Sequence, residues 1–389
     1  MLAEIALVEM VQIAIQTRPT EPFAVDPFAP RQVEIQASET VVGLIPDHTA
    51  DTLQASINAF LTDLVGSKPT DLAVIKPDEV FISRSQKVVV KVFSEKKLYK
   101  SLREISGQHA LEELDLKKVA LEKILGAGKC ILDGKTYVLL ALSQVPGQEI
   151  KGAVDAIFTM QDQTKAIARA QHILQRLGET FAQMHTRKAV TFKTAPQYAA
   201  YARQGTLLKI EKYLQDYQKN GGQEHAALQQ LFQEKIAQNQ STTLTVAAGH
   251  GDTHLMNFLF DETTDEIGIV DTTRAHLWVD PEGAPLYPIH IQDVARTIDD
   301  IAKWVLHHTF DPALIETLTD SFKAGYISIA PNLIPPSEQD LGISVAFLSR
   351  LRTAPLWDQK NDPVEKSAGK RIYAYYLSKL LHIPPRELF

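Results

Sequence analysis

Cysteine is almost missing from this sequence of 389 residues, in which Cys130 is the single one. One cysteine excludes an internal disulfide and any metal site built from several thiolates. We expect Cys130 to be a small core residue and the protein to work in the reducing cytoplasm. Residues 1–16 include Glu4 and Glu9 but no Lys or Arg, so they lack the basic start of a secretion signal.

Long apolar runs and basic runs are missing as well. No stretch of uncharged apolar residues is long enough for a membrane-spanning helix. The net charge is −7; residues 1–70 carry nine acidic and three basic residues, a net of −6, which leaves −1 for the remaining 319 residues. Nucleic-acid binding needs a basic surface that replaces condensed counterions, and membrane-surface binding needs a cluster of Lys and Arg. The sequence therefore predicts neither a nucleic acid nor a membrane as partner.

Turn residues and apolar spacing divide the chain into three predicted domains. Residues 1–48 are an acidic, proline-rich extension, with a short amphipathic helix expected over 1–16 and a linker or surface strap after it. Residues 49–143 are predicted to form a small antiparallel-sheet lobe, and residues 144–389 a large, mainly helical lobe. The predicted fold class is α+β.

The small lobe is expected to contain a helix over 51–64 and another over about 95–116. Its predicted strands are 72–75, 79–83, 87–93, 129–132 and 136–142, with Asp133-Gly134 as the turn of the last hairpin. In the large lobe, helices are predicted over 161–185, 206–219, 223–238 and from 292 onward, interrupted by a β-rich stretch at 243–273.

The chemically informative stretch runs from Gly249 to Thr273. Asp252 and Asn257 stand five residues apart before a strand-like run, and a second such run ends on Asp271. If the two runs pair as a hairpin, Asn257 and Asp271 lie at the same end of it. An amide oxygen and a carboxylate suit a hard cation such as Mg²⁺. Asp252 is a carboxylate that can accept a proton from a hydroxyl.

His250, Asp252 and Asn257, followed by a strand, a turn and a strand that ends on Asp271, resemble the catalytic segment of kinase-like phosphotransferases. The resemblance is to the aminoglycoside phosphotransferase and choline kinase family, and it covers roughly residues 50–300. It implies a two-lobe protein-kinase-like fold and an enzyme that transfers phosphate from ATP, with Mg²⁺, to a small-molecule hydroxyl. The acceptor would be like an aminoglycoside, an amino alcohol or a sugar. The Gly at position 251, in place of Arg, makes the segment resemble the small-molecule branch of these enzymes rather than the protein kinases.

The resemblance also implies a role for each site residue. Asp252 would act as the base, and Asn257 and Asp271 would bind Mg²⁺. Lys91 looks like the lysine that holds the phosphates of ATP, and Ala141 and Leu142 would lie against the adenine.

Two further side chains are expected to support this site. Lys91 lies in an apolar run and needs a carboxylate partner on the helix that follows, for which we choose Glu104, with Glu112 and Glu113 as alternatives. His250 is expected to brace the catalytic loop through hydrogen bonds of its ring.

The sequence departs from the family pattern at two places. The glycine-rich turn over the phosphates is replaced by Pro77–Glu79 or by Ser83–Gln86. Thr272 stands where an aromatic residue often follows the metal-binding Asp. The segment from Asp271 to Asp293 is also longer than usual. We expect that insertion to shape the acceptor site through Trp278, Asp280, Tyr287 and His290. Two other functions stay open: a non-catalytic nucleotide-binding or interaction module of this fold, and a kinase that acts on protein.

Overall fold

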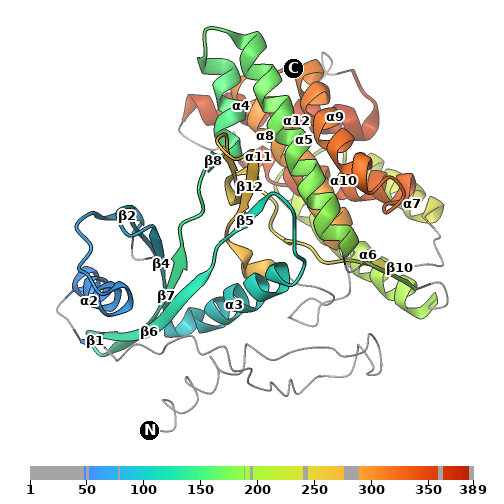
Figure 1. The fold of residues 1–389 in the computed structure, drawn as a ribbon. Helices are drawn as coiled ribbons and strands as arrows, with labels where there is room; N and C mark the ends of the chain where they lie inside the picture. The colour runs from blue at the N-terminus through green and yellow to red at the C-terminus, as the bar shows by residue number, and fades with distance from the viewer. Residues whose placement is uncertain are drawn as a thin grey trace. The chain divides into compact units, whose positions relative to one another are not determined.

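The computed structural model describes residues 48–49, 52–77, 79–187, 189–192, 196–239, 244–275, 289–357 and 362–384. The predicted helix over 1–16, the linker after it, and Trp278, Asp280 and Tyr287 of the predicted insertion lie outside the described residues. The chain divides into two compact units (Figure 1). Unit 1 takes its described residues from Met1–Asp115, Ala120–Pro146 and Gly268–His276, and unit 2 from Leu116–Val119, Gly147–Ile267 and Leu277–Phe389. The domain boundaries expected from the sequence stay a prediction.

Unit 1 is built on a six-stranded sheet with the order β1-β6-β7-β4-β3-β2. The strands are β1 (His48–Thr49), β2 (Leu72–Lys76), β3 (Val80–Ser83), β4 (Val88–Ser94), β6 (Ile124–Leu132) and β7 (Lys135–Ser143). β1 runs parallel to β6, and the other pairs are antiparallel. The predicted strands of the small lobe are confirmed, although β6 begins at Ile124 rather than at Lys129, because its earlier residues pair with β7 as well.

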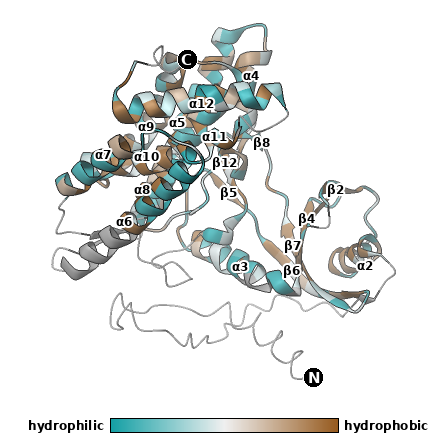
Figure 2. Cartoon of the chain, turned by 180° about the vertical axis from the view of Figure 1, so that it is seen from behind, coloured by the Kyte–Doolittle hydropathy of each residue, from teal (hydrophilic) through white to brown (hydrophobic). Residues whose placement is uncertain are grey.

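Two helices cover the two faces of this sheet. The helix α2 (Leu53–Val65) buries Ile57, Phe60 and Leu61 completely. They pack with alternate residues of β4 and β7, such as Val90 and Leu139. The helix α3 (Leu98–Glu112), preceded by the 3₁₀ turn η1 (Glu95–Lys97), places Ile105 against Phe93, Val138, Leu140 and Leu142 on the other face. Hydrophobic residues along β4 and β7 supply both layers of the core (Figure 2).

Strand alternation decides where Lys91 points. Val88, Val90 and Val92 of β4 belong to the core under α2. Successive residues of a strand point to opposite faces, so Lys91 belongs to the face covered by α3. Its cross-strand partner is Leu140, which packs with Ile105 of α3. The register of β4 therefore aims the Lys91 side chain at α3.

Unit 2 is mainly helical. Its helices are α4 (Ile150–Thr159), α5 (Gln163–Arg187), α6 (Pro196–Lys219), α7 (His225–Gln238), α8 (Ile289–His308), α9 (Pro312–Ile329), α10 (Pro336–Leu351), α11 (Ala354–Trp357) and α12 (Pro363–Leu381). The short strands of the chain are β5 (Val119–Leu121), β8 (Gln148–Glu149), β9 (Val190–Phe192), β10 (Leu244–Val246), β11 (Phe258–Asp261) and β12 (Glu266–Ile269). β9 pairs with β10, and the others form a sheet with the order β5-β12-β11-β8. The predicted hairpin of β11 and β12 is confirmed.

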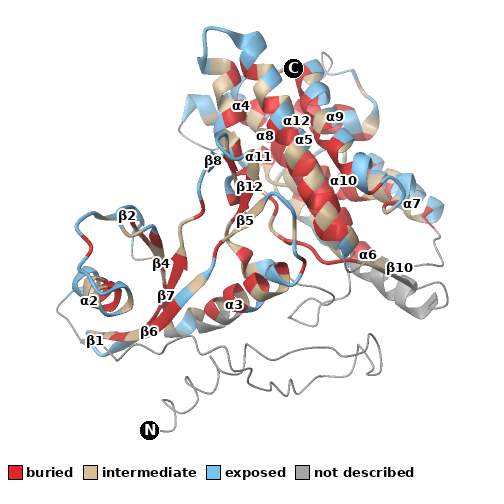
Figure 3. Cartoon of the chain, viewed as in Figure 1, coloured by how far each residue is buried: buried red, intermediate tan, exposed pale blue. Residues whose placement is uncertain are grey.

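Helices α5 and α9 are in backbone contact at two glycines. A Cβ atom on Gly178 of α5 would lie 2.0 Å from the carbonyl oxygen of Phe322 on α9. A Cβ atom on Gly325 of α9 would lie 2.0 Å from the carbonyl oxygen of Gln175 on α5. Neither position has room for a side chain. The buried residues of α5, which include Leu177 and Phe181, form the centre of unit 2 (Figure 3).

No helix in the described part of the chain is both long and apolar enough to cross a membrane.

Candidate active site

The predicted catalytic loop lies in unit 2, between β10 and β11. It ends in the 3₁₀ turn η2 (Leu255–Asn257), directly before β11. Gly251 has φ +77, a left-handed conformation that glycine adopts without a steric penalty. The Nδ2 atom of Asn257 donates a hydrogen bond to the carbonyl oxygen of Asp252 at 2.9 Å. The two residues predicted from their spacing are thus tied together across the loop.

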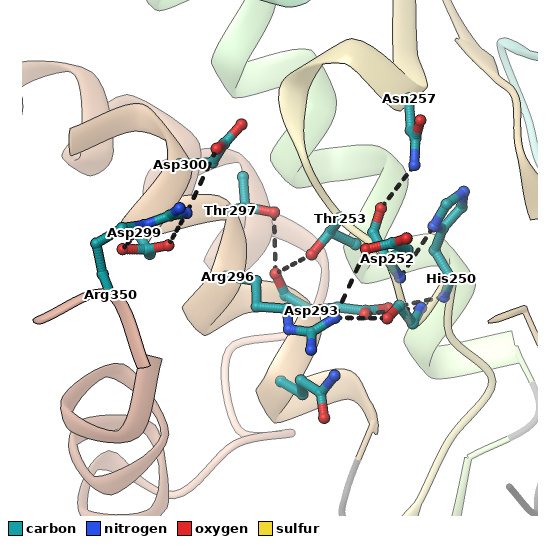
Figure 4. Close-up of polar contacts among 12 residues, drawn as sticks. His250, Asp252, Thr253, Asn257, Asp293, Arg296, Thr297, Asp299, Asp300 and Arg350 are labelled. Atoms are coloured by element: carbon teal, nitrogen blue, oxygen red, sulfur yellow. Dashed lines mark hydrogen bonds and ion pairs between the residues drawn. The ribbon is translucent and has the colours of Figure 1, made fainter. Parts of the chain in front are cut away.

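Side chains along one face of helix α8 contact the catalytic loop. This face carries Asp293, Arg296, Thr297 and Asp300, at the three-, four- and seven-residue spacing of neighbours on one helix face (Figure 4). The two carboxylates of this face accept hydrogen bonds from backbone amides of the loop. An α-helix therefore sets the conformation of a loop whose own regular structure is limited to the short turn η2.

Asp293 is fully buried and accepts from two successive loop amides. Its Oδ2 atom accepts from the His250 amide at 2.7 Å, and its Oδ1 atom accepts from the Gly251 amide at 2.9 Å. Burial alone would raise the pKa of Asp293, but its hydrogen bonds and its electrostatic interactions with His185 and His250 lower the pKa below the ordinary value. The carboxylate is therefore ionised and fixes the start of the loop.

Asp300, two turns further along α8, fixes the end of the loop. Its Oδ2 atom accepts from the Leu255 amide at 2.8 Å and from the Trp304 indole nitrogen at 3.1 Å. The side chain is only 4% exposed. Next to it, Asp299 pairs with Arg350 of α10 at 2.7 Å.

Two histidines brace the same region. The Asp252 amide donates to Nδ1 of His250 at 3.3 Å, which agrees with the prediction that this ring supports the loop. His185, at the end of α5, lies with Nε2 3.4 Å from Asp293 Oδ2 and Nδ1 3.0 Å from the Tyr326 hydroxyl. His185 is fully buried, so these two contacts link α5, α8 and α9 beneath the loop.

Arg296 is the charged neighbour of Asp252 that sequence reasoning missed. Its Nη1 atom donates to the Gly251 carbonyl oxygen at 2.8 Å and lies 3.8 Å from Asp252 Oδ1. Asp252 itself keeps 34% of its side chain exposed. Arg296 follows Asp293 by one helical turn, and that spacing was a usable signal once Asp293 had been assigned to the site.

Unit 1 contains a second polar cluster, centred on Lys91. Its Nζ atom lies 2.8 Å from Glu104 Oε1 and 3.5 Å from Glu122 Oε2. Burial alone would lower the pKa of Lys91, but the carboxylates of Glu122, Glu104 and Asp271 outweigh it and raise the pKa. Lys91 is therefore charged, and Glu104 is its nearest carboxylate, as predicted. Glu112, one of the two alternatives, instead contacts Gln108 and His109.

Glu122 was not foreseen from the sequence. It lies between β5 and β6 with 3% of its surface exposed. Burial raises its pKa to about 7, although Lys91 acts in the opposite direction. Its Oε2 atom also accepts from the Asp271 amide at 3.3 Å. The available signal was a glutamate directly after the apolar residues 119–121, because a charge that becomes buried needs a partner.

Asp271 follows β12 and has φ +55, a left-handed conformation that Asp tolerates better than most residues. The 3₁₀ turn η3 (Thr272–Arg274) comes next, and the Thr272 amide donates to Glu104 Oε1 at 3.0 Å. Asp271 is thus attached to the Lys91 cluster, within unit 1.

Ala141 and Leu142 lie near the end of β7 and are buried in the two cores of unit 1. Their side chains pack against protein, so a contact with adenine would come from their strand rather than from exposed side chains. Their role in nucleotide binding stays a prediction.

Of the two turns proposed to replace the glycine-rich turn, Pro77–Glu79 connects β2 to β3, and Ser83–Gln86 lies between β3 and β4. Glu79 pairs with Lys76 and, at 2.6 Å, with Lys97. Hydrogen bonds from these two lysines lower the pKa of Glu79 to about 2. The first turn therefore has a carboxylate, paired with lysines of β2 and η1, in place of glycines.

Within the described residues, no group of three or more His, Cys, Asp or Glu side chains is arranged to hold a metal ion. Mg²⁺ needs fewer protein ligands, since it keeps several waters and uses one or two protein oxygens together with substrate phosphates. Asn257 directs Nδ2 to the Asp252 carbonyl, which leaves its Oδ1 atom as the end suited to a cation. Asn257 in unit 2 and Asp271 in unit 1 each offer an oxygen donor of the kind that Mg²⁺ prefers.

A family model described as the phosphotransferase enzyme family (APH) matches residues 80–277, which is 198 of 389 residues. The chain belongs to this family. The match contains Lys91, Asp252, Asn257 and Asp271, and confirms the resemblance inferred from the sequence. Helix α8 of this phosphotransferase, which holds the loop, follows the matched range.

Solved structures of glucosamine kinase share the fold of the phosphotransferase. A glucosamine kinase in complex with glucosamine, ADP and inorganic phosphate has a TM-score of 0.57 at 15% identity, covering 86% of this chain and 84% of that one. A second crystal form of a glucosamine kinase has a TM-score of 0.53 at 16% identity, covering 86% and 88%. An aminoglycoside phosphotransferase from Streptomyces rimosus has a TM-score of 0.44 at 15% identity, covering 75% and 98%. No curated protein sequence matches the chain. The predicted kinase-like α+β fold is confirmed.

Proposed function

We propose that this phosphotransferase moves the γ-phosphoryl group of ATP to a hydroxyl of a small molecule, with Asp252 as the base. The supporting observation is the contrast between the catalytic loop and its carboxylate. Buried contacts from α8 fix the loop backbone, whereas Asp252 keeps 34% of its side chain exposed. A fixed backbone with one accessible carboxylate is suited to orienting a hydroxyl.

Asp252 accepts a hydrogen bond from the acceptor hydroxyl and takes its proton as the transfer proceeds. The hydroxyl oxygen forms the new bond to phosphorus while the bond to the β-phosphate oxygen breaks, and ADP leaves. Phosphoryl transfer asks little covalent chemistry of the protein, so positioning and charge supply most of the rate. Arg296, which bonds the Gly251 carbonyl and lies beside Asp252, keeps the carboxylate in place.

Lys91 pairs with phosphate oxygens of ATP, and Glu104 holds the lysine side chain in position. The adenine lies against the strand end at Ala141 and Leu142. Asn257 and Asp271 would hold Mg²⁺, which when bound neutralises phosphate charge. The cytoplasmic location expected from the cysteine content belongs to the same proposal.

The acceptor is a small molecule in this proposal. Support comes from Gly251 in the catalytic loop and from the glucosamine kinase structure with a TM-score of 0.57, which binds glucosamine. Amino sugars are therefore the first compounds for an acceptor screen, followed by amino alcohols and aminoglycosides.

The test combines binding and transfer on the full chain. Melting temperature is measured with ATP plus Mg²⁺ and with ATP plus EDTA, for the wild type, Asp252→Asn and Asp271→Asn. Phosphate transfer is measured with the acceptor panel. Asp340→Asn, on the exposed side of α10, is the matched control.

We expect a Mg²⁺-dependent rise in melting temperature for the wild type and for Asp252→Asn, and a smaller rise for Asp271→Asn. Phosphate transfer is expected only for the wild type and the control Asp340→Asn. Near-normal turnover by Asp252→Asn would show that another group is the base. A wild type that binds no nucleotide would favour the non-catalytic interaction module, for which the glycine-free turn at Pro77–Glu79 is the specific support.

A further inference from the structure

The hydroxyl of Thr273 lies between two carboxylates of unit 1. Its Oγ1 atom is 2.8 Å from Glu104 Oε2 and also contacts Asp271 Oδ1 within hydrogen-bond distance. A threonine hydroxyl has one hydrogen, so it can donate fully to only one of these oxygens at a time. The direction of this hydrogen depends on the relative charge of the two carboxylates.

The surrounding contacts keep the Glu104 carboxylate and the turn η3 in place. Glu104 Oε1 accepts from Lys91 Nζ at 2.8 Å and from the Thr272 amide at 3.0 Å. The Thr272 hydroxyl donates to the Glu104 carbonyl oxygen at 3.1 Å. A Cβ atom on Gly107 of α3 would lie 1.9 Å from the Thr272 carbonyl oxygen, so the helix backbone rests directly on η3. The hydrogen of the Thr273 hydroxyl can therefore point either to Glu104 Oε2 or to Asp271 Oδ1.

We propose that Thr273 is a positioning residue that couples a cation at Asp271 to the ion pair of Lys91 and Glu104. This inference rests on the proposed function, because it requires Asp271 to bind Mg²⁺. Positive charge at Asp271 makes its oxygen a weaker acceptor, and the Thr273 hydrogen then turns to Glu104 Oε2. Glu104 gains a charge-assisted hydrogen bond on Oε2, which fixes its carboxylate in the orientation that places Oε1 beside Lys91 Nζ.

The coupling works in both directions. If a cation at Asp271 strengthens the Thr273 bond to Glu104, then a well-placed Lys91–Glu104 pair strengthens cation binding by the same factor. Mg²⁺ and the phosphate groups of ATP should consequently bind better together than either does alone. Removing the hydroxyl should reduce this cooperation, whereas a purely local structural role would affect binding equally with and without the metal.

The experiment is calorimetric titration of the full chain with ATP, once with Mg²⁺ and once with EDTA. Thr273→Val keeps the shape of the side chain and removes the hydroxyl, and Thr273→Ser keeps the hydroxyl. We expect Thr273→Val to weaken ATP binding about tenfold with Mg²⁺ and less than about twofold with EDTA, as for loss of one charge-assisted hydrogen bond. Thr273→Ser should stay within about twofold of the wild type in both conditions.

Equal binding by Thr273→Val and the wild type with Mg²⁺, or equal losses in both conditions, would overturn the coupling and leave the proposed function standing. A wild type that gains nothing from Mg²⁺ would overturn both. Melting curves of the unliganded variants check folding, and Thr273→Ala is the second hydroxyl-free variant if Thr273→Val unfolds.

Discussion

The substitutions Asp293→Asn and Asp300→Asn should destabilise the catalytic loop to very different extents, although both remove one charge from the same face of α8. Asp293 uses both of its oxygens for loop amides: Oδ2 for His250 and Oδ1 for Gly251. Asp300 uses Oδ2 for both the Leu255 amide and the Trp304 indole. Asparagine has one acceptor oxygen, so it can replace the oxygen that Asp300 needs but not the two that Asp293 needs.

The difference in free energy follows from these bonds. Asp293→Asn loses one hydrogen bond to a charged acceptor, about 1.5–3 kcal/mol, and leaves a buried amide hydrogen facing an NH₂ group, about 1–3 kcal/mol. The sum is about 2.5–6 kcal/mol. Asp300→Asn keeps both bonds to one oxygen and weakens them by removing the charge, which costs the loop about 1 kcal/mol. It also loses the contact of Oδ1 with Lys303 at 3.4 Å, but that contact lies within α8 and does not involve the loop.

Hydrogen–deuterium exchange of peptides covering 247–258 measures this difference locally. Exchange in the loop should accelerate about 10²- to 10⁴-fold in Asp293→Asn, and less than about tenfold in Asp300→Asn, since about 1.4 kcal/mol corresponds to a factor of ten. Peptides from α12 serve as the internal control. Equal acceleration by the two variants would refute the reasoning, because charge rather than the allocation of oxygens would then hold the loop.

Two further predictions concern the stability of unit 2. Gly325→Ala should destabilise the protein by about 1–3 kcal/mol, because its Cβ would meet the backbone of α5, whereas Gly152→Ala on α4 meets nothing within 4 Å and should stabilise by about 0.5–1 kcal/mol; urea unfolding checks both. Burial and His185 lower the pKa of His290 from 6.5 to about 3, so the unfolded chain binds its proton more readily. The free energy of unfolding should therefore fall by about 2 kcal/mol from pH 6.5 to 5 because of His290. His290→Leu should remove this decrease, and an identical pH dependence of the variant and the wild type would contradict the prediction.

Local chemistry made much of the fold predictable. Asp133 and Gly134 have φ +50 and +72, as a two-residue hairpin turn requires, and this dipeptide located the hairpin of β6 and β7 from the sequence. Likewise, the helix expected over 51–64 is α2, which begins after the side-chain cap of Thr52 and ends at Gly66. These signals act within a few residues, so no knowledge of the tertiary fold was needed.

The supporting residues of the site were harder to predict because their partners are distant in the sequence. Glu122 meets Lys91 across 31 positions, and Asp300 meets the Leu255 amide across 45 positions. A charged residue among apolar ones indicates that a partner is needed, but the local sequence does not identify that partner. Lys91 and Glu104 were paired correctly because the helix with Glu104 directly follows the strand with Lys91.

The bonds between Glu104 and η3 have a consequence for protein synthesis. Thr272, whose amide satisfies the Glu104 carboxylate, stands 168 positions later in the chain. At about 5–20 residues per second, a ribosome needs roughly 8–34 s to reach it. During that interval the nascent sheet of unit 1 can form, but Glu104 lacks the amide and hydroxyl donors of η3, and the surface of α3 at Gly107 stays uncovered. Unit 1 is therefore first in sequence yet among the later parts to be completed, and residues 1–146 expressed alone should not reproduce it.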